Sequence, residues 1–373
     1  MSVATDDIYG RLREKLDTLG FGLPASIPAV QGDKPEIRVL KELFSAEDAE
    51  FFVAMRSGYQ TAEAFAATSG YPVEIARAKL LDMSKRGLLY RRGGDDGLEY
   101  RLIPMAHGVF EFNVNDAGLA KWFMPFAEYL GASAFMPAVT GTDSPFERTV
   151  PCKAEYVEGG ILPQDDIVRL VNDMDDSFAI TDCLCRKAPH VALGAPLKHP
   201  LRTCMYTGEW ARYAVENGFA ERVSREEILG VIRDSEPAGR MVQVLNSANP
   251  EVICSCDGEA CLVLVQHKLG IPGPARALRS NYDAAVVQDL CNSCGVCIET
   301  CPVNALKLDA GPAKLEIDLG MCCGCGLCVG VCPEGALKLV KKEQVYTPVG
   351  GAFSSYDRQA AYRDADPNAV TTG

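Results

Sequence analysis

The sequence contains the run Cys291-Asn-Ser-Cys294-Gly-Val-Cys297-Ile-Glu-Thr-Cys301-Pro302 and then the run Cys322-Cys-Gly-Cys325-Gly-Leu-Cys328-Val-Gly-Val-Cys332-Pro333. Both have the spacing C-x2-C-x2-C-x3-C-P, and a constant offset relates Cys291 to Cys322 and Cys301 to Cys332. The same offset relates Ala305-Leu-Lys-Leu308 to Ala336-Leu-Lys-Leu339. The short gaps between cysteines put three sulfur atoms on one tight loop, so each run is suited to binding metal. The stretch therefore predicts an internally repeated module with two related metal sites.

The spacing resembles that of bacterial ferredoxins, which hold two [4Fe–4S] clusters. The resemblance covers residues 283–340. It implies that each cluster takes three cysteines from its own run and the fourth from the other run. One cluster would then be bound by Cys291, Cys294, Cys297 and Cys332, and the other by Cys322, Cys325, Cys328 and Cys301. The chemistry implied is the transfer of single electrons.

A disulfide knot and a zinc site are weaker interpretations of the two runs, because neither uses eight cysteines in this pattern. Gly295, Gly324 and Gly326 would let the backbone approach the cluster sulfides closely. Cys323, next to a ligand, is expected to be a packed free thiol. The module carries seven Asp or Glu residues against three lysines, which suits docking to a basic partner protein.

The 373-residue chain is long enough for two or three domains. Its 16 cysteines, with no signal-peptide-like N-terminus, indicate metal ligands rather than disulfides and a cytoplasmic location. No run of about 18 apolar residues occurs, so no transmembrane segment is expected. The formal charge of −13 argues against nucleic acid as the main partner and favours a protein with a basic patch.

We predict a multi-domain α+β fold that begins with a helix and a proline-containing linker over residues 1–36. Residues 37–103 resemble a winged helix, since helix candidates are followed by two strands, 88–91 and 98–102, joined by glycines and aspartates. Residues 72–92 carry six basic and two acidic side chains. A DNA-reading helix has this composition, and so does a solvated helix face or a protein-docking surface.

Residues 104–270 are predicted to form an α/β middle domain. A helix over residues 115–130 would bury its aromatic side chains in the core, and Ser224-Arg-Glu-Glu227 is a capping box that starts another helix. The prolines of residues 271–274 mark the boundary with the ferredoxin-like module. Residues 341–373 show no periodicity and are predicted to be an extended tail that is mobile or wraps a partner.

A second cysteine set lies in this middle domain. It comprises Cys183, Cys185, Cys204, Cys254, Cys256 and Cys261. Each of its two C-x-C pairs follows a predicted strand, so the pairs could present four sulfurs to one site. Six thiols in this part of the chain exceed what packing needs, which favours a metal centre over buried free cysteines. A third [4Fe–4S] cluster is favoured over zinc because the chain already requires cluster assembly. The four ligands stay undecided among the six cysteines.

The layout also resembles a family of bacterial iron–sulfur proteins that join a winged-helix-like region, a Cys-x-Cys-Arg middle domain and a two-cluster ferredoxin. The residues that carry this resemblance are Gly108-Val-Phe-Glu-Phe112, Cys183-Leu-Cys185-Arg186, Cys204 and Cys254-Ser-Cys256. The chain departs from the family where Asp257 and Gly258 replace a denser cysteine run. The resemblance implies an electron-transfer subunit or adaptor. Arg186 would offset cluster charge, hold a partner carboxylate or form an ordinary salt bridge.

Few residues outside these sets suggest chemistry. His190 and His199 lie between Cys185 and Cys204, where either could be a metal ligand or proton relay, although a surface role is the simpler interpretation. Cys152 is isolated and expected to be structural. No dinucleotide-binding or P-loop motif occurs, so nothing indicates a bound nicotinamide, flavin or ATP.

The sequence therefore predicts an iron–sulfur electron-transfer protein that serves a larger oxidoreductase complex through redox partner proteins. Two alternatives stay open. One is an iron–sulfur-sensing regulator that reads DNA with residues 72–92. The other is a redox enzyme subunit in which the metal of the middle domain performs substrate chemistry. The number of cysteines cannot separate a relay from such a subunit.

Overall fold

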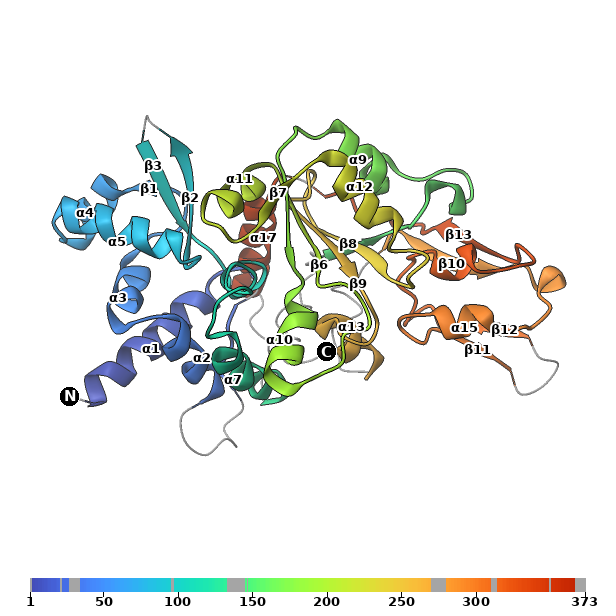
Figure 1. The fold of residues 1–373 in the computed structure, drawn as a ribbon, viewed down its shortest axis with the longest axis horizontal. Helices are drawn as coiled ribbons and strands as arrows, with labels where there is room; N and C mark the ends of the chain where they lie inside the picture. The colour runs from blue at the N-terminus through green and yellow to red at the C-terminus, as the bar shows by residue number, and fades with distance from the viewer. Residues whose placement is uncertain are drawn as a thin grey trace.

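Three parts follow one another along the longest axis of the computed structural model (Figure 1). A mainly helical head lies at one end, a six-stranded sheet with its helices lies in the middle, and a small cysteine-rich module lies at the other end. The structure describes residues 2–20, 22–26, 34–94, 97–132, 145, 147–269, 280–309, 314–348 and 350–365. Most of the predicted linker, over 27–33, and the predicted boundary at 271–274 lie outside these residues.

The head is built from helices and a small sheet. Its helices are α1 (Ser2–Asp17), α2 (Pro35–Leu43), α3 (Ala46–Ala54), α4 (Ala62–Ser69) and α5 (Val73–Lys85). The strands β1 (Gln60–Thr61), β2 (Leu89–Gly94) and β3 (Gly97–Leu102) pair antiparallel in the order β1-β3-β2. Ser45 and Asp48 form a capping box at the start of α3, which satisfies backbone N–H groups of its first turn. The hairpin predicted after α5 is thus confirmed.

The middle part is organised around a sheet with the strand order β4-β8-β9-β6-β5-β7. Its strands are β4 (Glu147–Val150), β5 (Phe178–Asp182), β6 (Arg202–Thr207), β7 (Glu221–Val223), β8 (Met241–Leu245) and β9 (Val252–Cys256). The helices around it are α7 (Leu119–Ala132), α9 (Ile167–Asp173), α10 (Leu184–Leu193), α11 (Gly208–Glu216), α12 (Arg225–Arg233) and α13 (Leu262–Lys268).

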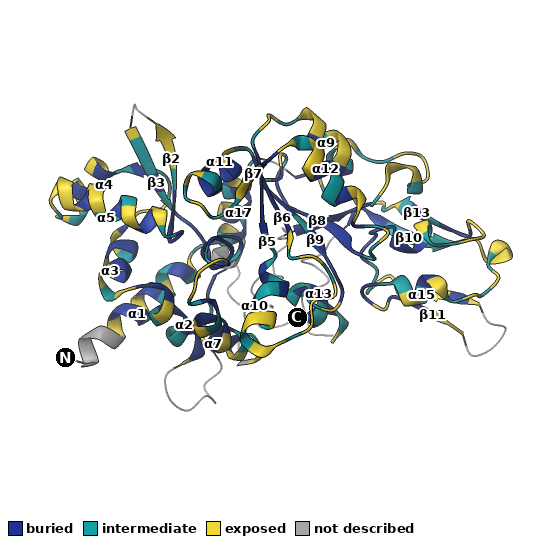
Figure 2. Cartoon of the chain, in the orientation of Figure 1, coloured by how far each residue is buried: buried dark blue, intermediate teal, exposed yellow. Residues whose placement is uncertain are grey.

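The predicted α/β class of this part needs correction, because every pair of neighbouring strands is antiparallel. Helices and strands do alternate along the chain, but the connections do not make the right-handed crossovers of a parallel sheet. The middle part is therefore α+β. The predicted capping box at Ser224 and Glu227 forms and starts α12. The strands are buried along most of their length (Figure 2).

The head and the middle part share one hydrophobic core. Tyr213 of α11 donates its hydroxyl toward the carbonyls of Ser84 and Leu89 at 2.8 and 2.7 Å, which ties the middle part to the strand β2. Arg91 of β2 donates to the side chain of Asn217. The two predicted domains are consequently packed against each other rather than separated by solvent.

The prediction of an extended tail is wrong for the described part of residues 341–373. Helix α17 (Ala352–Ala365) packs into the shared core, where Tyr356 is 3% exposed and the ring of Phe353 lies 5.2 Å from that of Tyr90. Its apolar side is marked by few large residues, and the polar Ser355 and Gln359 are also buried. The sequence of this helix therefore shows little amphipathic contrast.

The cysteine-rich module is held together by two small antiparallel sheets. One pairs β10 (Tyr282–Val286) with β13 (Leu337–Lys341), and the other pairs β11 (Leu306–Leu308) with β12 (Leu315–Ile317). Short helices α15 (Val296–Thr300) and α16 (Leu327–Gly330) follow the first cysteines of each run. The module joins the middle part through backbone bonds from Cys152 N to Cys325 O and from Glu158 N to Leu339 O. Within the described residues, no helix is both long enough and apolar enough to cross a bilayer.

Candidate functional site

The first thiol set of the module lies at the far end of the molecule. Cys291, Cys294, Cys297 and Cys332 line one small cavity of about 20 Å³. Cys297 is buried at the start of α15, whereas Cys294 is exposed. Burial raises the pKa of the Cys297 thiol, and the nearby thiols of Cys332, Cys291 and Cys294 raise it further. The structure therefore brings these four predicted ligands together, one of them from the second run.

The second set lies closer to the middle part. Cys325 and Cys328 are buried, and Cys322 and Cys301 are half-buried. Burial raises the pKa of the Cys328 thiol, and Cys322 and Cys301 add to the shift. Cys301 of the first run thus lies with three thiols of the second run. The assignment of four ligands to each cluster stays a prediction.

The two runs repeat each other in three dimensions. The backbone N–H of Ala305 donates to Cys301 Sγ, and that of Ala336 donates to Cys332 Sγ, both at 3.3 Å. Gly295 and Gly326, with φ of 80° and 83°, precede α15 and α16. Converging thiols that also accept backbone N–H bonds suit [4Fe–4S] clusters, whose ligands are cysteine thiolates stabilised in this way. The residues present therefore fit this cofactor.

The structure requires a glycine at position 324 for a reason other than the close approach to the cluster sulfides that the sequence suggested. A Cβ at this position would lie 2.3 Å from the carbonyl oxygen of Tyr282, so the glycine permits close packing against β10. Cys323 is buried and its thiol points to the carbonyl of Met321 at 3.6 Å, as a packed free thiol would. Cys152 lies beside the second set, where burial raises the pKa of its thiol to about 12.

The six cysteines of the middle part all line one cavity of about 100 Å³. Cys183 precedes α10, and Cys185 lies in its first turn. Cys204 of β6 pairs with Cys254 of β9, which also carries Cys256. Cys261 precedes α13. Four separate elements therefore deliver their thiols to one place, as the sequence suggested for the two C-x-C pairs.

Contacts link the six thiols into one chain, in which Cys183, Cys185, Cys261 and Cys256 follow one another. Thiol hydrogen bonds run from Cys183 to Cys185, from Cys185 to Cys261 and from Cys261 to Cys256. Cys183 is also close enough to Cys256 for its charge to act on that thiol, and we call these four thiols the middle ring. Cys254 contacts Cys256 and, on its other side, Cys204.

The close approach of these four thiols favours a metal site over the alternative of four buried free cysteines. Hydrogen bonds from Cys254 and Cys261 lower the pKa of Cys256 although it is buried, whereas the hydrogen bond to Cys185 and burial raise the pKa of Cys183. Thiolate charges this close to one another need compensation, and a metal centre would supply it in place of the thiol protons. The four thiols of Cys183, Cys185, Cys256 and Cys261 fit such a centre.

Arg186 lies next to the ring and forms a salt bridge. It is 4% exposed and donates to Asp257 Oδ2 at 3.1 Å and to the carbonyl of Ser255 at 3.2 Å. The charges of Cys183 and Cys256 also act on its guanidinium. Arg240, also buried, is near Cys183, and its Nε and Nη1 have no hydrogen-bond partner among the described residues. Two guanidinium groups therefore lie where thiolate charge would develop.

Three residues of this cavity were not assigned a role from the sequence. His107 precedes the short helix α6 (Phe110–Phe112), Glu111 lies within it, and Glu147 begins β4. All three are buried. The one available signal was a charged residue flanked by two phenylalanines in the stretch 108–112. The histidines that the sequence singled out, His190 and His199, do not line this cavity.

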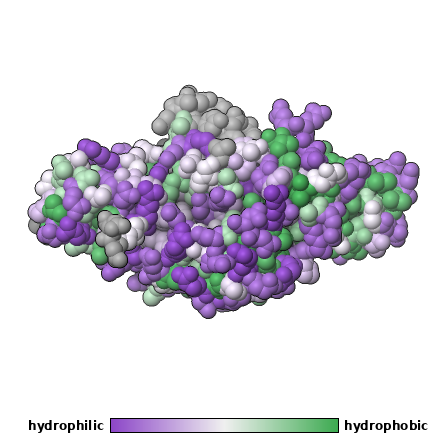
Figure 3. Space-filling model, turned by 90° about the horizontal axis from the view of Figure 1, so that it is seen from above, coloured by the Kyte–Doolittle hydropathy of each residue, from purple (hydrophilic) through white to green (hydrophobic). Residues whose placement is uncertain are grey.

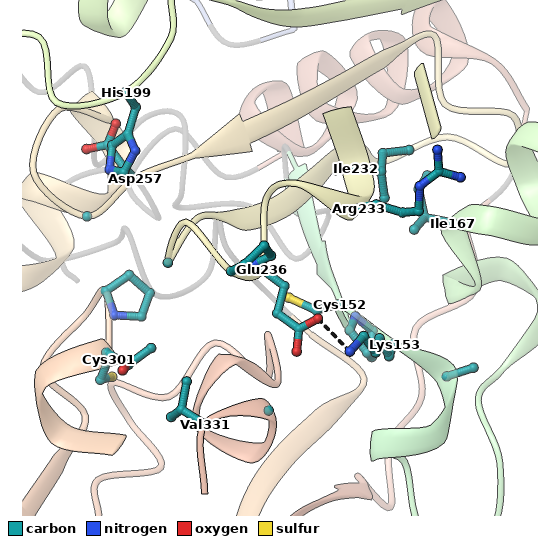
Figure 4. Close-up of a pocket in the computed structure, with 18 of the residues that line it drawn as sticks. Cys152, Lys153, Ile167, His199, Ile232, Arg233, Glu236, Asp257, Cys301 and Val331 are labelled. Atoms are coloured by element: carbon teal, nitrogen blue, oxygen red, sulfur yellow. Dashed lines mark ion pairs between the residues drawn. The ribbon is translucent and has the colours of Figure 1, made fainter. Parts of the chain in front are cut away.

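A larger cleft of about 1100 Å³ is lined by residues of both the middle part and the module (Figure 4). His199 and Asp257 lie together on one side, and Cys301 and Val331 of the module lie on another. Lys153 and Glu236 form an ion pair of 2.9 Å in the cleft. The cleft therefore reaches a cysteine of the second thiol set.

Comparison with known proteins agrees with the module alone. Residues 290–336 match the family described as "4Fe-4S dicluster domain". No curated protein and no solved structure matches the chain. Iron–sulfur binding of the [4Fe–4S] type is thus supported for these residues, and a 4Fe-4S dicluster domain suggests iron–sulfur electron transfer.

Proposed function

We propose that the chain is an electron-transfer subunit or adaptor in which three thiol sets form one relay across the molecule. The sets are the middle ring, the Cys322–Cys325–Cys328–Cys301 set and the Cys291–Cys294–Cys297–Cys332 set. The main support for this proposal is that Cys256 and Cys261 of the ring belong to one buried apolar cluster with Cys325 of the second set. Cys301 of the second set packs against the same cluster. A relay needs neighbouring centres with little solvent between them.

Contacts between the loops of the two parts support this order. A Cβ on Gly258, which follows Cys256 closely, would lie 2.2 Å from the carbonyl oxygen of Pro302, which follows Cys301. His267 of α13 also contacts the carbonyl of Met321 at 2.8 Å, directly before Cys322. These contacts fix the ring relative to the second set.

Each set would hold a [4Fe–4S] cluster, which takes up and releases one electron at a time. The chain itself supplies burial, N–H donors and charge. Cys301 and Cys332 accept backbone N–H bonds, and Arg186 and Arg240 place positive charge beside the ring. Hydrogen bonds and cations favour the more negative, reduced state and so raise the potential of the centre they contact.

The exposed end of the module is the proposed docking site for a redox partner. Leu290 is 52% and Val296 42% exposed beside the first set, and hydrophobic atoms lie among polar ones at this end of the surface (Figure 3). Asp289 and Glu334 are exposed nearby. A partner with a basic rim and an apolar centre would fit this surface.

The head has the order of elements expected of a winged helix, with β1 between α3 and α4, and with α5 before the β2–β3 hairpin. Five of the six basic side chains of residues 72–92 are already paired with carboxylates, which argues against DNA binding. The ion pairs are Arg77–Glu63, Lys79–Glu47, Arg86–Asp48, Arg91–Glu216 and Arg92–Glu99. We therefore favour a structural or protein-docking role for the head. Salt-dependent binding to duplex DNA would contradict this.

A catalytic subunit is the second candidate, and the cleft of Figure 4 favours it. A substrate-dependent change in the spectrum of the middle centre, absent in Cys183→Ser, would support that function. The cytoplasmic location expected from the cysteine content stays a prediction that cell fractionation would test.

Iron and sulfide analysis of anaerobically prepared protein tests the proposal. Three clusters require about twelve iron atoms per chain, and Cys183→Ser should retain about eight. Cys152→Ser is the matched control, because this thiol belongs to none of the three sets, and it should retain about twelve. About eight iron atoms per chain in the unaltered protein would contradict the middle cluster. About four or fewer would contradict the whole relay.

A further inference from the structure

One side of the thiol cavity carries a histidine and two glutamates instead of further cysteines. His107 Nε2 lies 2.7 Å from Glu147 Oε1, and His107 Nδ1 lies 3.3 Å from Glu111 Oε1. The three side chains belong to residues between 3% and 8% exposed. Buried ionisable groups are normally paired with one another or bound to a metal, and a cluster of them in a cavity is a candidate functional site.

The charges of this group do not balance. His107, even when protonated, offsets only one of two carboxylates, and none of the described residues that line the cavity is a lysine or an arginine. Phe110, Phe126 and Leu130 line the same space. An excess negative charge in such surroundings is costly, and a bound cation lowers the cost.

The donor atoms also have the spacing of a metal site. One ligand atom each from His107, Glu147 and Cys254 lies within 4.8 Å of the others. Two donors on one tetrahedral zinc ion lie about 3.3 Å apart. The His107–Glu147 separation of 2.7 Å therefore needs to widen by only about 0.6 Å for an ion to replace the shared proton.

The surroundings of His107 match those of a metal ligand. Glu111 Oε1 is placed to accept the Nδ1–H of the imidazole, which would make Nε2 the metal-binding nitrogen. Glu111 is itself held, because its Oε2 accepts the backbone N–H of Gly108 at 2.7 Å. A carboxylate that orients a histidine in this way is the usual second partner of a zinc-binding imidazole.

We propose that His107, Glu147 and Cys254 bind one divalent transition-metal ion, with zinc favoured by the mixed N, O and S donors. One carboxylate and one thiolate neutralise the two charges of the ion, so Glu111 is the one carboxylate of this group left uncompensated. Cys204, opposite Cys254 across β6 and β9, is a further donor available for a tetrahedral ion. The availability of Cys254 rests on the proposed function, which assigns Cys183, Cys185, Cys256 and Cys261 to the cluster.

Zinc binding to the full chain tests the site. Anaerobically prepared protein with its clusters is treated with a chelator and then titrated with Zn²⁺, and zinc K-edge X-ray absorption reports the donors without interference from iron. We expect about one zinc per chain with nitrogen or oxygen and at least one sulfur in its shell. His107→Ala and Glu147→Gln should lose this zinc, and Glu111→Gln should weaken its binding about 10- to 100-fold.

His199→Ala is the control, because this histidine lies outside the cavity, and it should bind zinc normally. Iron content and the EPR spectra of the module show whether each variant is folded. An all-sulfur shell, or equal zinc binding in His107→Ala and unaltered protein, would overturn the site. Cys183→Ser separates the two proposals, since it should lose iron yet keep zinc. If the unaltered protein holds only about eight iron atoms but binds zinc through His107, the cluster assignment fails and the zinc site stands.

Discussion

Replacing Gly258 by alanine should disturb the contact between the middle ring and the module. A Cβ built on Gly258 lies 2.2 Å from the carbonyl oxygen of Pro302 and 2.9 Å from its Cα and C atoms. Ordinary van der Waals contact begins at 3.4 Å, so the two loops must separate by about 1.2 Å. The obstructing atoms belong to backbone next to Cys301, which cannot move away as a flexible side chain would.

Overpacking of this kind costs about 1 to 3 kcal/mol. The loop that carries Cys256 and Cys261 would move away from Cys301, so electron exchange between these sets should slow. Urea unfolding measures the stability, and rapid-freeze EPR after mixing with a reductant measures how quickly the two signals equilibrate. Gly230→Ala is the control, since it lies inside α12 and a Cβ there would meet the end of the Arg233 side chain at 4.0 Å. It should be neutral or stabilise by up to about 1 kcal/mol.

The reasoning would be refuted if Gly258→Ala had the stability and electron-exchange rate of the unaltered protein. Slower exchange without a loss of stability would still support the contact, because the strain would then have been relieved by movement of the loops.

Three further changes address the head, the tail and the module. Asp48→Ala should destabilise the protein by about 3 kcal/mol in urea unfolding, because it removes the α3 capping box and leaves Arg86 without its buried partner. The control is Asp82→Ala, which removes the exposed partner of Arg86 and should cost less than about 1 kcal/mol. Tyr356→Ala should cost about 3 to 5 kcal/mol by calorimetry, since its ring is buried against Trp210, and no loss would show that α17 does not dock. Cys332→Ser should alter the EPR signal of the Cys297 set while that of the Cys328 set persists, and the reverse result would exchange the two ligand assignments.

The module could be predicted in detail because its chemistry demands local spacing. Cysteines separated by such short gaps must share a loop, and the constant offset from Cys291 to Cys322 makes the second half a copy of the first. The capping box at Ser224 was readable for a similar reason, since the bonds it makes stay within the first turn of α12.

Features that depend on distant contacts were less readable. The antiparallel sheet brings Cys204 to Cys254 although they are far apart in the sequence, and no local pattern specifies that pairing. The helix α17 has only a few large apolar residues, and its burial depends on the aromatic cluster around Trp210. His107 and Glu147 likewise meet from distant segments, so neither resembles a ligand until the chain is folded.

Magnetic coupling between the reduced centres tests the relay most directly. Neighbouring paramagnetic clusters broaden and split each other's EPR signals, and the effect falls steeply with distance. In fully reduced protein we predict that the signal of the Cys301 set is coupled to two neighbours. In Cys183→Ser it should lose one coupling, while the Cys297 set stays unchanged. Identical coupling of the Cys301 set in both proteins would contradict a third centre beside the module, and with it the relay.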